Sequence, residues 1–315
     1  MDILKKGDVL RKILAVSGGI DSMVLMYIFR NDPSVVVAHF NHGTRESCRD
    51  DEEFVCAKAK EYGLEYVVGH GELGENVSEE QARYSRYEFF SKVAEKYDGE
   101  MFVAHHGNDL IESMAINLAR GTGWRGLAPF GNKEIWRPFI EPGLLPSAVL
   151  GELFEYSTPV LREPDYFVVF KDAIYRYAYV HDISFRQDPT NSDDKYLRNR
   201  IRSEVSNLLP GTILGLLKIY HRTNILKGHI DTLVEELLPG DVLPGGREYR
   251  REWFYDMPGD VAVEVLRGGL IRAGISATRP QIRDFLSAIK NYAPGKKFNL
   301  PGDKLVEIKR DTFWL

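Results

Sequence analysis

One short segment near the start of the chain constrains the fold more than any other. It is the hexapeptide Ser17-Gly18-Gly19-Ile20-Asp21-Ser22, which stands between the apolar run Ile13–Val16 and an amphipathic stretch that begins at Ser22. A strand that turns through two glycines into a helix directs several backbone N–H groups at one point, where the helix dipole also favours negative charge. The segment therefore predicts a strand–loop–helix unit that binds phosphate.

Two better-known phosphate loops do not match this segment. It lacks the lysine of the Walker pattern GxxxxGK(S/T) and the glycine spacing of the dinucleotide pattern GxGxxG. A simpler alternative is a tight turn between strand and helix, in which Ser17 or Asp21 caps the helix and no ligand binds.

Short apolar runs alternate with amphipathic stretches between Arg11 and about Arg137. This alternation is typical of βαβ units around a parallel sheet, so we predict an α/β fold whose ligands bind at the carboxyl ends of the strands. The strands are expected at Ile13–Val16, Val35–Phe40, Glu65–Val68 and Met101–His105. The helices are expected at Ser22–Arg30, Arg49–Tyr62, Ser78–Tyr97 and Asp109–Arg120.

Proline and glycine divide the rest of the chain. We predict a catalytic domain over residues 1–205, a helical linker over residues 206–245 and a small α+β C-terminal domain over residues 246–315. Four prolines scattered over residues 141–167 indicate an irregular insertion in the first domain. Further helices are expected at Lys171–His181, Asp260–Ala273 and Arg279–Asn291, with a closing hairpin that turns at Pro301-Gly302-Asp303.

A histidine and two carboxylates accompany the fourth expected strand. His105 stands at its carboxyl end, and Asp109 and Glu112 follow three residues apart on one face of the next helix, in its first turn. The carboxylates can hold an ammonium group or share Mg²⁺ with phosphates, while His105 can donate a hydrogen bond or move a proton. Alternatively, the acids only complement the helix dipole, and His105 or His106 is a packed histidine.

Basic residues are concentrated in one later segment. Residues 195–227 contain seven lysines and arginines, among them Arg198, Arg200 and Arg202, against a single acid, Glu204. Such a stripe suits a phosphate backbone. Arg83 and Arg86 share a helical face with the aromatic Tyr87, which also suits nucleic acid. A solvated charged face is the alternative for either segment.

The overall composition restricts the class of protein. The net charge of −5 does not exclude a nucleic-acid partner, because binding needs only a local basic surface. Cys48 and Cys56 have neither the number nor the spacing of a disulfide framework or a zinc site, so we expect both to be reduced. We find no signal peptide or membrane span and expect a cytoplasmic protein.

Taken in order, these segments resemble the tRNA(Ile)-lysidine synthetases, a family of the PP-loop ATP pyrophosphatase superfamily. The resemblance runs in colinear order over nearly the whole chain. The matching segments are Ser17–Ser22, Ala38–Ser47, Glu80–Tyr87, Ala104–Glu112, Ala119–Leu127, Arg137-Pro138, Asp188–Asn191, Arg198–Arg202 and Gly295–Gly302.

The resemblance implies a two-step reaction on RNA. ATP, with Mg²⁺, adenylates O2 of the wobble cytidine in the isoleucine tRNA that has a CAU anticodon, and pyrophosphate is released. The ε-amine of L-lysine then attacks C2, and AMP leaves. The implied fold is a parallel-sheet, adenine-nucleotide-binding PP-loop domain followed by a small tRNA-binding domain. An oligomer is possible, and we expect a dimer.

The resemblance and the chemistry of the residues together suggest roles for the site residues. ATP would be bound by Ser17, Gly18, Gly19, Ile20, Asp21 and Ser22, with Asp21 near Mg²⁺ or the attacking oxygen. Asp109 and Glu112 would orient lysine, and His105 would handle its proton. Arg198 or Arg200 would stabilise charge at the α-phosphate. The tRNA would be held by Arg83, Arg86, Arg120 and Arg202.

Three other functions compete with this one. A PP-loop tRNA sulfurtransferase would adenylate a base in the same way, but its chemistry favours paired thiolates or a cluster, which Cys48 and Cys56 do not provide. Amide-forming relatives that make small metabolites would leave the arginine stripe unexplained. A nucleotide-binding regulator without catalysis would need the loop but not His105, Asp109 and Glu112.

Overall fold

A computed structural model describes residues 10–43, 47–71, 79–130, 134–158, 161–186, 201–202, 204–205, 207–238 and 247–315. The chain forms two compact units. The first falls within residues 1–122 and 126–221, and the second within residues 123–125 and 222–315. Each unit is described by itself below. Our division of the chain at residues 205 and 245 stays a prediction.

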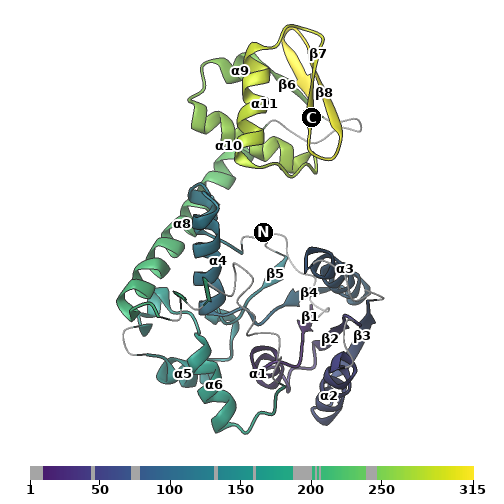
Figure 1. Ribbon diagram of the computed structural model, residues 1–315, viewed down its shortest axis with the longest axis vertical. Coiled ribbons are helices and arrows are strands. Elements are labelled where there is room, and N and C mark those ends of the chain that lie inside the picture. Colours follow the sequence, from purple (N-terminus) through teal and green to yellow (C-terminus); the bar gives the residue numbers. More distant parts are fainter. Residues whose placement is uncertain are drawn as a thin grey trace. The chain divides into compact units, whose positions relative to one another are not determined.

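The first unit contains a parallel sheet with the strand order β3-β2-β1-β4-β5 (Figure 1). In register, Ile13 of β1 lies beside Val36 of β2 on one side and Met101 of β4 on the other. The chain therefore reverses direction across the sheet between β1 and β4, which is where ligands bind in such folds. The strands are β1 (Arg11–Ala15), β2 (Val35–Asn41), β3 (Glu65–His70), β4 (Gly99–Phe102) and β5 (Ile135–Trp136).

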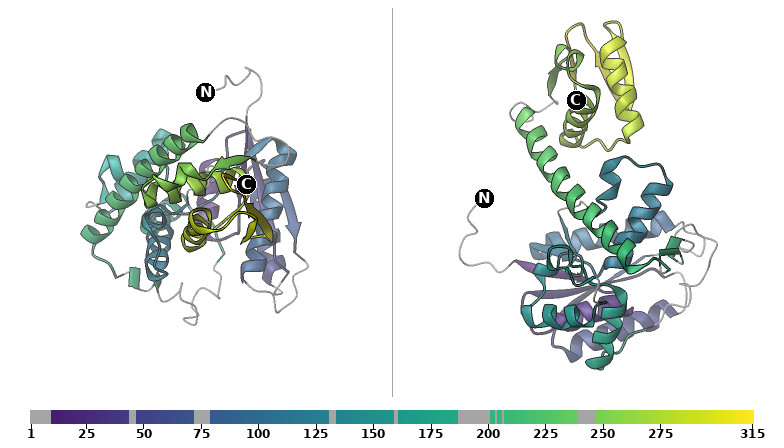
Figure 2. Two further views of the ribbon diagram at one scale, coloured as in Figure 1. Left: turned by 90° about the horizontal axis from the view of Figure 1, so that it is seen from above. Right: turned by 90° about the vertical axis from the view of Figure 1, so that its left-hand side faces the viewer.

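Helices cover both faces of this sheet (Figures 1 and 2). They are α1 (Ile20–Ile28), α2 (Ser47–Glu61), α3 (Glu79–Tyr97), α4 (Gly107–Ala119), α5 (Ser147–Tyr156) and α6 (Lys171–Val180), and α8 (Pro210–Leu237) begins in this unit. Short 3-10 turns lie at Trp124–Leu127, Pro142–Leu144 and Pro164–Tyr166. The α/β fold and the first four predicted strand–helix pairs are confirmed.

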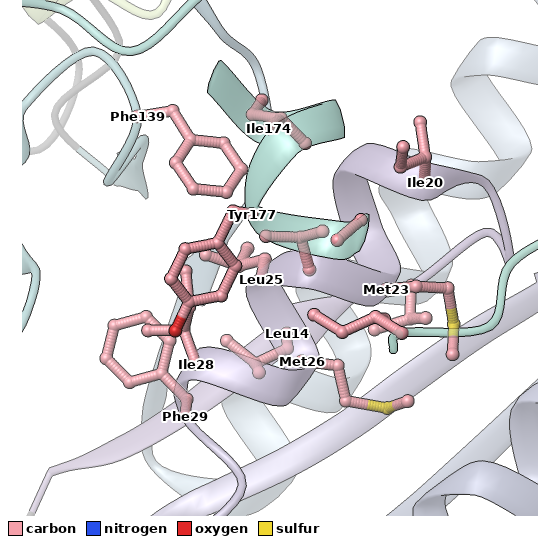
Figure 3. Close-up of a cluster of buried hydrophobic side chains, with 14 of the residues drawn as sticks. Leu14, Ile20, Met23, Leu25, Met26, Ile28, Phe29, Phe139, Ile174 and Tyr177 are labelled. Carbon is pink, nitrogen blue, oxygen red and sulfur yellow. The ribbon is translucent and has the colours of Figure 1, made fainter. Parts of the chain in front are cut away.

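Alternation along β1 produces a core on each face. Leu14 packs with Met23, Leu25 and Tyr177 on one face (Figure 3), whereas Ile13 packs with residues of α3 on the other. All seven residues of β2 are buried, because this strand has a neighbouring strand on each side and helices pack on the sheet.

Among the boundaries that differ from the prediction, two affect the placement of the site residues. The fourth strand ends at Phe102 rather than at His105, since the following residues turn away and α4 begins at Gly107. As α4 starts two residues earlier than expected, Glu112 lies in its second turn and not in its first.

The prediction of an irregular segment over residues 141–167 was wrong in its middle. Ser147–Tyr156 forms α5, which packs on α6, and Leu153 is fully buried in the core that contains α1. Pro146 precedes the helix and does not interrupt it, a position that proline tolerates because the first helical N–H groups have no partner within the helix.

The second unit is an α+β domain with a small antiparallel sheet of order β6-β9-β8-β7. Its core includes Phe254, Phe285 and Phe313, all fully buried. The predicted hairpin is present, with Gly302 and Asp303 at positive φ in its turn. The elements are β6 (Glu248–Arg250), α9 (Glu252–Tyr255), α10 (Gly259–Arg272), α11 (Arg279–Asn291), β7 (Lys296–Leu300), β8 (Lys304–Ile308) and β9 (Thr312–Trp314). Among the described residues, no helix is long and apolar enough to cross a membrane.

Candidate active site

A cavity of about 800 Å³ opens at the carboxyl ends of β1, β2 and β4. The carboxyl ends of the strands are where the sequence predicted a ligand site, and the cavity also lies at the point where the strand order reverses. The lining residues that matter for the chemistry are Ser17, Gly18, Gly19, Ile20, Asp21, Ser22, Arg86, His105, Asp109, Lys171, Arg186 and Arg202.

The loop after β1 is held in shape by its own side chains. The N–H of Ser17 donates to Oγ of Ser22 over 3.1 Å, and that hydroxyl donates to the carbonyl of Gly19 over 2.9 Å. Gly18 has a φ of +92°, which strongly favours glycine. Its carbonyl also accepts the N–H of Arg186. The loop is thus preorganised. The hydroxyl of Ser22 stabilises it through two hydrogen bonds, and Ser22 also lines the cavity.

Asp21, in the first turn of α1, stands between two cations. Its Oδ1 lies 3.5 Å from Nε2 of His106, and its Oδ2 lies 3.7 Å from Nζ of Lys171. Burial alone would raise the pKa of this carboxyl, but His106 and Lys171 outweigh that effect and lower it. Asp21 is therefore ionised at neutral pH.

His106 links Asp21 to Asp109. While Nε2 faces Asp21, Nδ1 lies 3.6 Å from Oδ2 of Asp109, and the side chain is almost completely buried. Burial alone would lower the pKa of His106, yet the two carboxylates together raise it and favour the protonated ring. The backbone N–H of His106 also donates to Asp109 over 3.1 Å. A carboxylate–imidazolium–carboxylate chain thus connects the phosphate loop to α4.

His105 lines the cavity but has the opposite electrostatic character. Its ring stacks on Phe130 with centroids 5.0 Å apart, and its Nδ1 is buried without a hydrogen-bond partner among the described residues. Burial lowers the pKa of His105 to about 4, and nearby Arg137 contributes in the same direction. At neutral pH His105 is an uncharged imidazole.

The structure separates the two carboxylates that the sequence paired. Asp109 lines the cavity, whereas Glu112 is only 3% exposed and is not among the described residues that line the cavity. Nε and Nη2 of Arg202 approach the two oxygens of Glu112 at 3.0 and 3.5 Å. Arg202 itself lines the cavity. Glu112 therefore reaches the site through Arg202.

The other predicted arginines fall in different places. Arg86 lines the cavity, and the guanidinium groups of Arg83 and Arg86 lie 5.0 and 5.7 Å from the ring centre of Tyr87. Arg120 is the exposed C-cap residue of α4 and is absent from the described lining. Arg198 and Arg200 lie outside the described residues.

Three charged residues of the site were missed by the sequence analysis. His106 was interpreted as a packed histidine, Lys171 as the start of a helix, and Arg186 was not considered. Arg186 donates through Nε to Asp51 over 2.7 Å and through its backbone to the phosphate loop. Signals existed for two of them, since His106 and Lys171 stand at the N-termini of helices, where anions bind.

Comparison with known proteins agrees with this geometry. The family model of the PP-loop domain matches residues 2–209, more than half of the chain. The chain is similar to a tRNA(Ile)-lysidine synthase of Thermotoga sp. (strain RQ2), at 30% identity over 73% of this chain and 53% of that protein. It is also similar to a tRNA(Ile)-lysidine synthase of Geobacter sulfurreducens, at 31% identity over 76% of this chain and 49% of that one. It thus spans about half the length of these curated relatives.

A solved structure shows the same fold. It is the U34-tRNA thiolase of Methanococcus maripaludis with its iron–sulfur cluster, with a TM-score of 0.50 and 17% identity over 69% of this chain and 72% of that one. At this identity the likeness concerns the fold alone. The match to the family model and the loop at the switch point of the sheet lead to one conclusion: this chain belongs to the PP-loop family.

Proposed function

We propose that the chain is a tRNA(Ile)-lysidine synthetase, an ATP-dependent ligase. The observation that carries the proposal is that the phosphate loop and Asp109 line one cavity and are joined through His106. Membership of the PP-loop family implies the use of ATP. The similarity to tRNA(Ile)-lysidine synthases supports a tRNA substrate.

In the first step, O2 of the wobble cytidine attacks the α-phosphorus of ATP. A bond forms between that oxygen and phosphorus, and the bond to the bridging oxygen breaks, so pyrophosphate leaves with the electron pair. The N–H groups of the loop at Ser17–Gly19 and the N-terminus of α1 would hold the pyrophosphate. The loop already has its hydrogen-bonded conformation without a ligand, which lowers the entropic cost of ordering the loop when the ligand binds.

Mg²⁺ is the metal expected for this step, and Asp21 fits it. The carboxylate is ionised and lines the cavity, and its Oδ2 lies 3.7 Å from Nζ of Lys171, which is longer than a hydrogen bond. Carboxylate oxygens together with phosphate oxygens are the usual ligands of this ion in proteins. When bound, Mg²⁺ supplies positive charge that neutralises the phosphates.

In the second step, the ε-amine of L-lysine attacks C2 of the adenylated base. A C–N bond forms, the bond between C2 and O2 breaks, and AMP leaves with O2 and the electron pair. The ammonium group must first lose a proton. We propose that Asp109 orients the ammonium and that Glu112 acts through Arg202. Neutral His105 would accept the proton from the ammonium and pass it to water, and the amine would then attack.

The tRNA would contact residues outside the cavity as well as residues that line it. Arg86 lines the cavity and would contact RNA there, while Arg83 on α3 and Arg120 after α4 would contact RNA outside the cavity. Because Arg202 pairs with buried Glu112, we assign it mainly to ordering the site. Arg198 and Arg200 keep their predicted role at the α-phosphate, and the second unit keeps its predicted role in binding tRNA.

One assay tests the function directly. The chain is incubated with ATP, Mg²⁺, radiolabelled lysine and an unmodified transcript of the isoleucine tRNA with a CAU anticodon, and a methionine tRNA serves as the control. We expect label in the isoleucine tRNA alone. Label in neither tRNA would refute the proposal.

The competing functions give different results in the same reaction. A regulator without catalysis would form no AMP from ATP, with or without tRNA. A sulfurtransferase would form AMP but attach no lysine. Burial raises the pKa of the Cys56 thiol, which disfavours the thiolate that sulfur transfer needs. Light scattering tests the expected dimer.

A further inference from the structure

Lys171 occupies an unusual position for a cation. It is the first residue of α6, where the helix dipole favours anions and disfavours positive charge. Its side chain nevertheless lines the cavity, with Nζ 3.7 Å from Asp21 and 6.0 Å from the ring centre of Tyr175. A ligand anion in the cavity would compensate both the lysine and the helix N-terminus.

Other cations of the cavity are bound more firmly than Lys171. Arg186 has a carboxylate oxygen of Asp51 at 2.7 Å, and Arg202 has one of Glu112 at 3.0 Å. The 3.7 Å between Lys171 and Asp21 exceeds hydrogen-bond length, and the lysine side chain is 42% exposed. Of these three cations, Lys171 lies farthest from its carboxylate partner and so forms the weakest ion pair.

Asp21 does not depend on Lys171 alone. His106 is buried, and its Nε2 lies 3.5 Å from the other oxygen of Asp21. The ammonium group can therefore turn toward a ligand without leaving a buried carboxylate unpaired.

The backbone of Lys171 is held in place by its neighbours. Its N–H donates to Oδ1 of Asn108 over 3.0 Å, and the N–H of Gly107 donates to the carbonyl of Val169 over 2.8 Å. The ring of Phe170 lies so close to Gly107 that a Cβ there would meet it at 2.7 Å. These contacts hold the start of α6 against the start of α4, so Lys171 is positioned beside the phosphate loop in advance.

We propose that Lys171 is a further catalytic residue, which contacts oxygens of the α-phosphate of ATP. This inference rests on the proposed function. The loop at Ser17–Gly19 holds the pyrophosphate end and Asp109 marks the acceptor end, so the α-phosphate lies between them, beside Asp21. As the bond from cytosine O2 to phosphorus forms and pyrophosphate departs with its electron pair, the ammonium stabilises the charge on the phosphate oxygens. It neither gives nor takes a proton.

The first test uses the unmodified protein. Lysine amines are acetylated with N-hydroxysuccinimidyl acetate, with and without ATP and Mg²⁺, and each site is followed by mass spectrometry. Lys12 is the control, because it pairs with Asp32 at the start of β1, at the opposite end of the sheet. At an ATP concentration well above the dissociation constant, the acetylation of Lys171 should slow by a factor of about ten or more. The acetylation rate of Lys12 should not change. Equal rates at Lys171 with and without ATP overturn the proposal.

The second test separates chemistry from binding. We expect Lys171→Met to lower tRNA-dependent AMP formation at saturating ATP by about 100-fold, with a smaller change in the dissociation constant of ATP. Lys171→Arg should restore part of the rate, and Lys12→Met should match the wild type. A wild-type rate for Lys171→Met overturns the proposal, and if that variant does not fold, the acetylation result decides.

The two proposals fail in different ways. If the wild-type protein attaches no lysine to tRNA but ATP still protects Lys171, the lysidine synthetase function is wrong and the phosphate contact stands. If the protein attaches lysine and ATP leaves Lys171 unprotected, the contact alone is wrong.

Discussion

Two adjacent histidines differ in charge because they face different groups. His106 is buried and His105 is partly buried, and the loss of water around each ring disfavours its protonated form. His106 faces the carboxylates of Asp21 and Asp109, whereas His105 lies against Phe130 and near the guanidinium of Arg137. The sequence shows two adjacent histidines but not which of them is charged. Asp21 on α1, and Phe130 and Arg137 on either side of β5, help to set the charge of each ring, and they are distant from the histidines in the sequence.

Replacing His106 should damage both stability and activity. In His106→Gln the two carboxylates lose the buried cation between them, which we expect to reduce the free energy of unfolding by about 3 kcal/mol. Urea denaturation measures the stability and AMP formation measures the activity. The exposed His229 on α8 provides the control, and His229→Gln should resemble the wild type. Equal behaviour of the two variants would contradict the role given to His106.

The low pKa of His105 predicts how its ring titrates. With a pKa of about 4, the ring should stay neutral from pH 8 to pH 5, while an ordinary histidine becomes charged near pH 6.5. Because the unfolded chain takes up this proton more readily, the effect of His105 is to reduce stability as the pH falls from about 6.5 toward 4. Nitrogen-15 NMR of the ring, assigned with His105→Gln, measures the titration. A ring that titrates near pH 6.5 would show that the site is hydrated.

At the scale of elements, periodic patterns predicted the sheet and the first four helices well. Strands β1 to β4 are apolar runs of ordinary length, but β5 has only two residues and left no pattern. Helix α5 was missed because its flanking prolines were taken as a sign of irregular chain. The loop after β1 could be predicted because it is local. The place of Lys171 could not, because it depends on the packing of α6 against α4, which are remote in sequence.

The contact between α4 and α6 gives a prediction of its own. In Gly107→Ala the new methyl group would lie 2.7 Å from the ring of Phe170, so the helices must separate, and we expect a loss of about 1–3 kcal/mol in the free energy of unfolding. Gly151 in α5 is the matched control, since no described atom lies within 4 Å of a Cβ there. Gly151→Ala should stabilise the protein by up to about 1 kcal/mol. Urea denaturation of both variants checks the difference, and a stabilising Gly107→Ala would contradict the packing.

At the scale of the whole molecule, an acidic chain has several cations in the lining of one cavity. The net charge is −5, yet Arg86, Lys171, Arg186 and Arg202 all line one cavity. They come from separate stretches of the chain, so composition alone could not reveal the site.

The chain passes between the two units more than once. Residues 123–125 belong to the second unit, although the residues on both sides of them belong to the first.

Arg125 shows why this short segment belongs to the second unit. Its Nε lies 2.7 Å from Glu264 and its Nη2 lies 2.6 Å from Asp231, and Glu264 is largely buried. Arg125→Met leaves Glu264 with Arg267, 3.4 Å away, as its remaining ion-pair partner in the described residues. We therefore expect a loss of about 1–3 kcal/mol in the stability of this unit, less than for a fully unpaired buried charge.

The matched control for Arg125 is Arg250 in the same unit, whose ion pair with Glu252 is well exposed to solvent. Arg250→Met should hardly change the stability, because water screens an exposed pair. Hydrogen exchange of the amides in α10 and α11 measures the stability of the unit within the intact chain, since these helices exchange only when their core opens. If both variants exchange at the same rate, Arg125 adds nothing to this core, and the assignment of residues 123–125 to the second unit loses its physical basis.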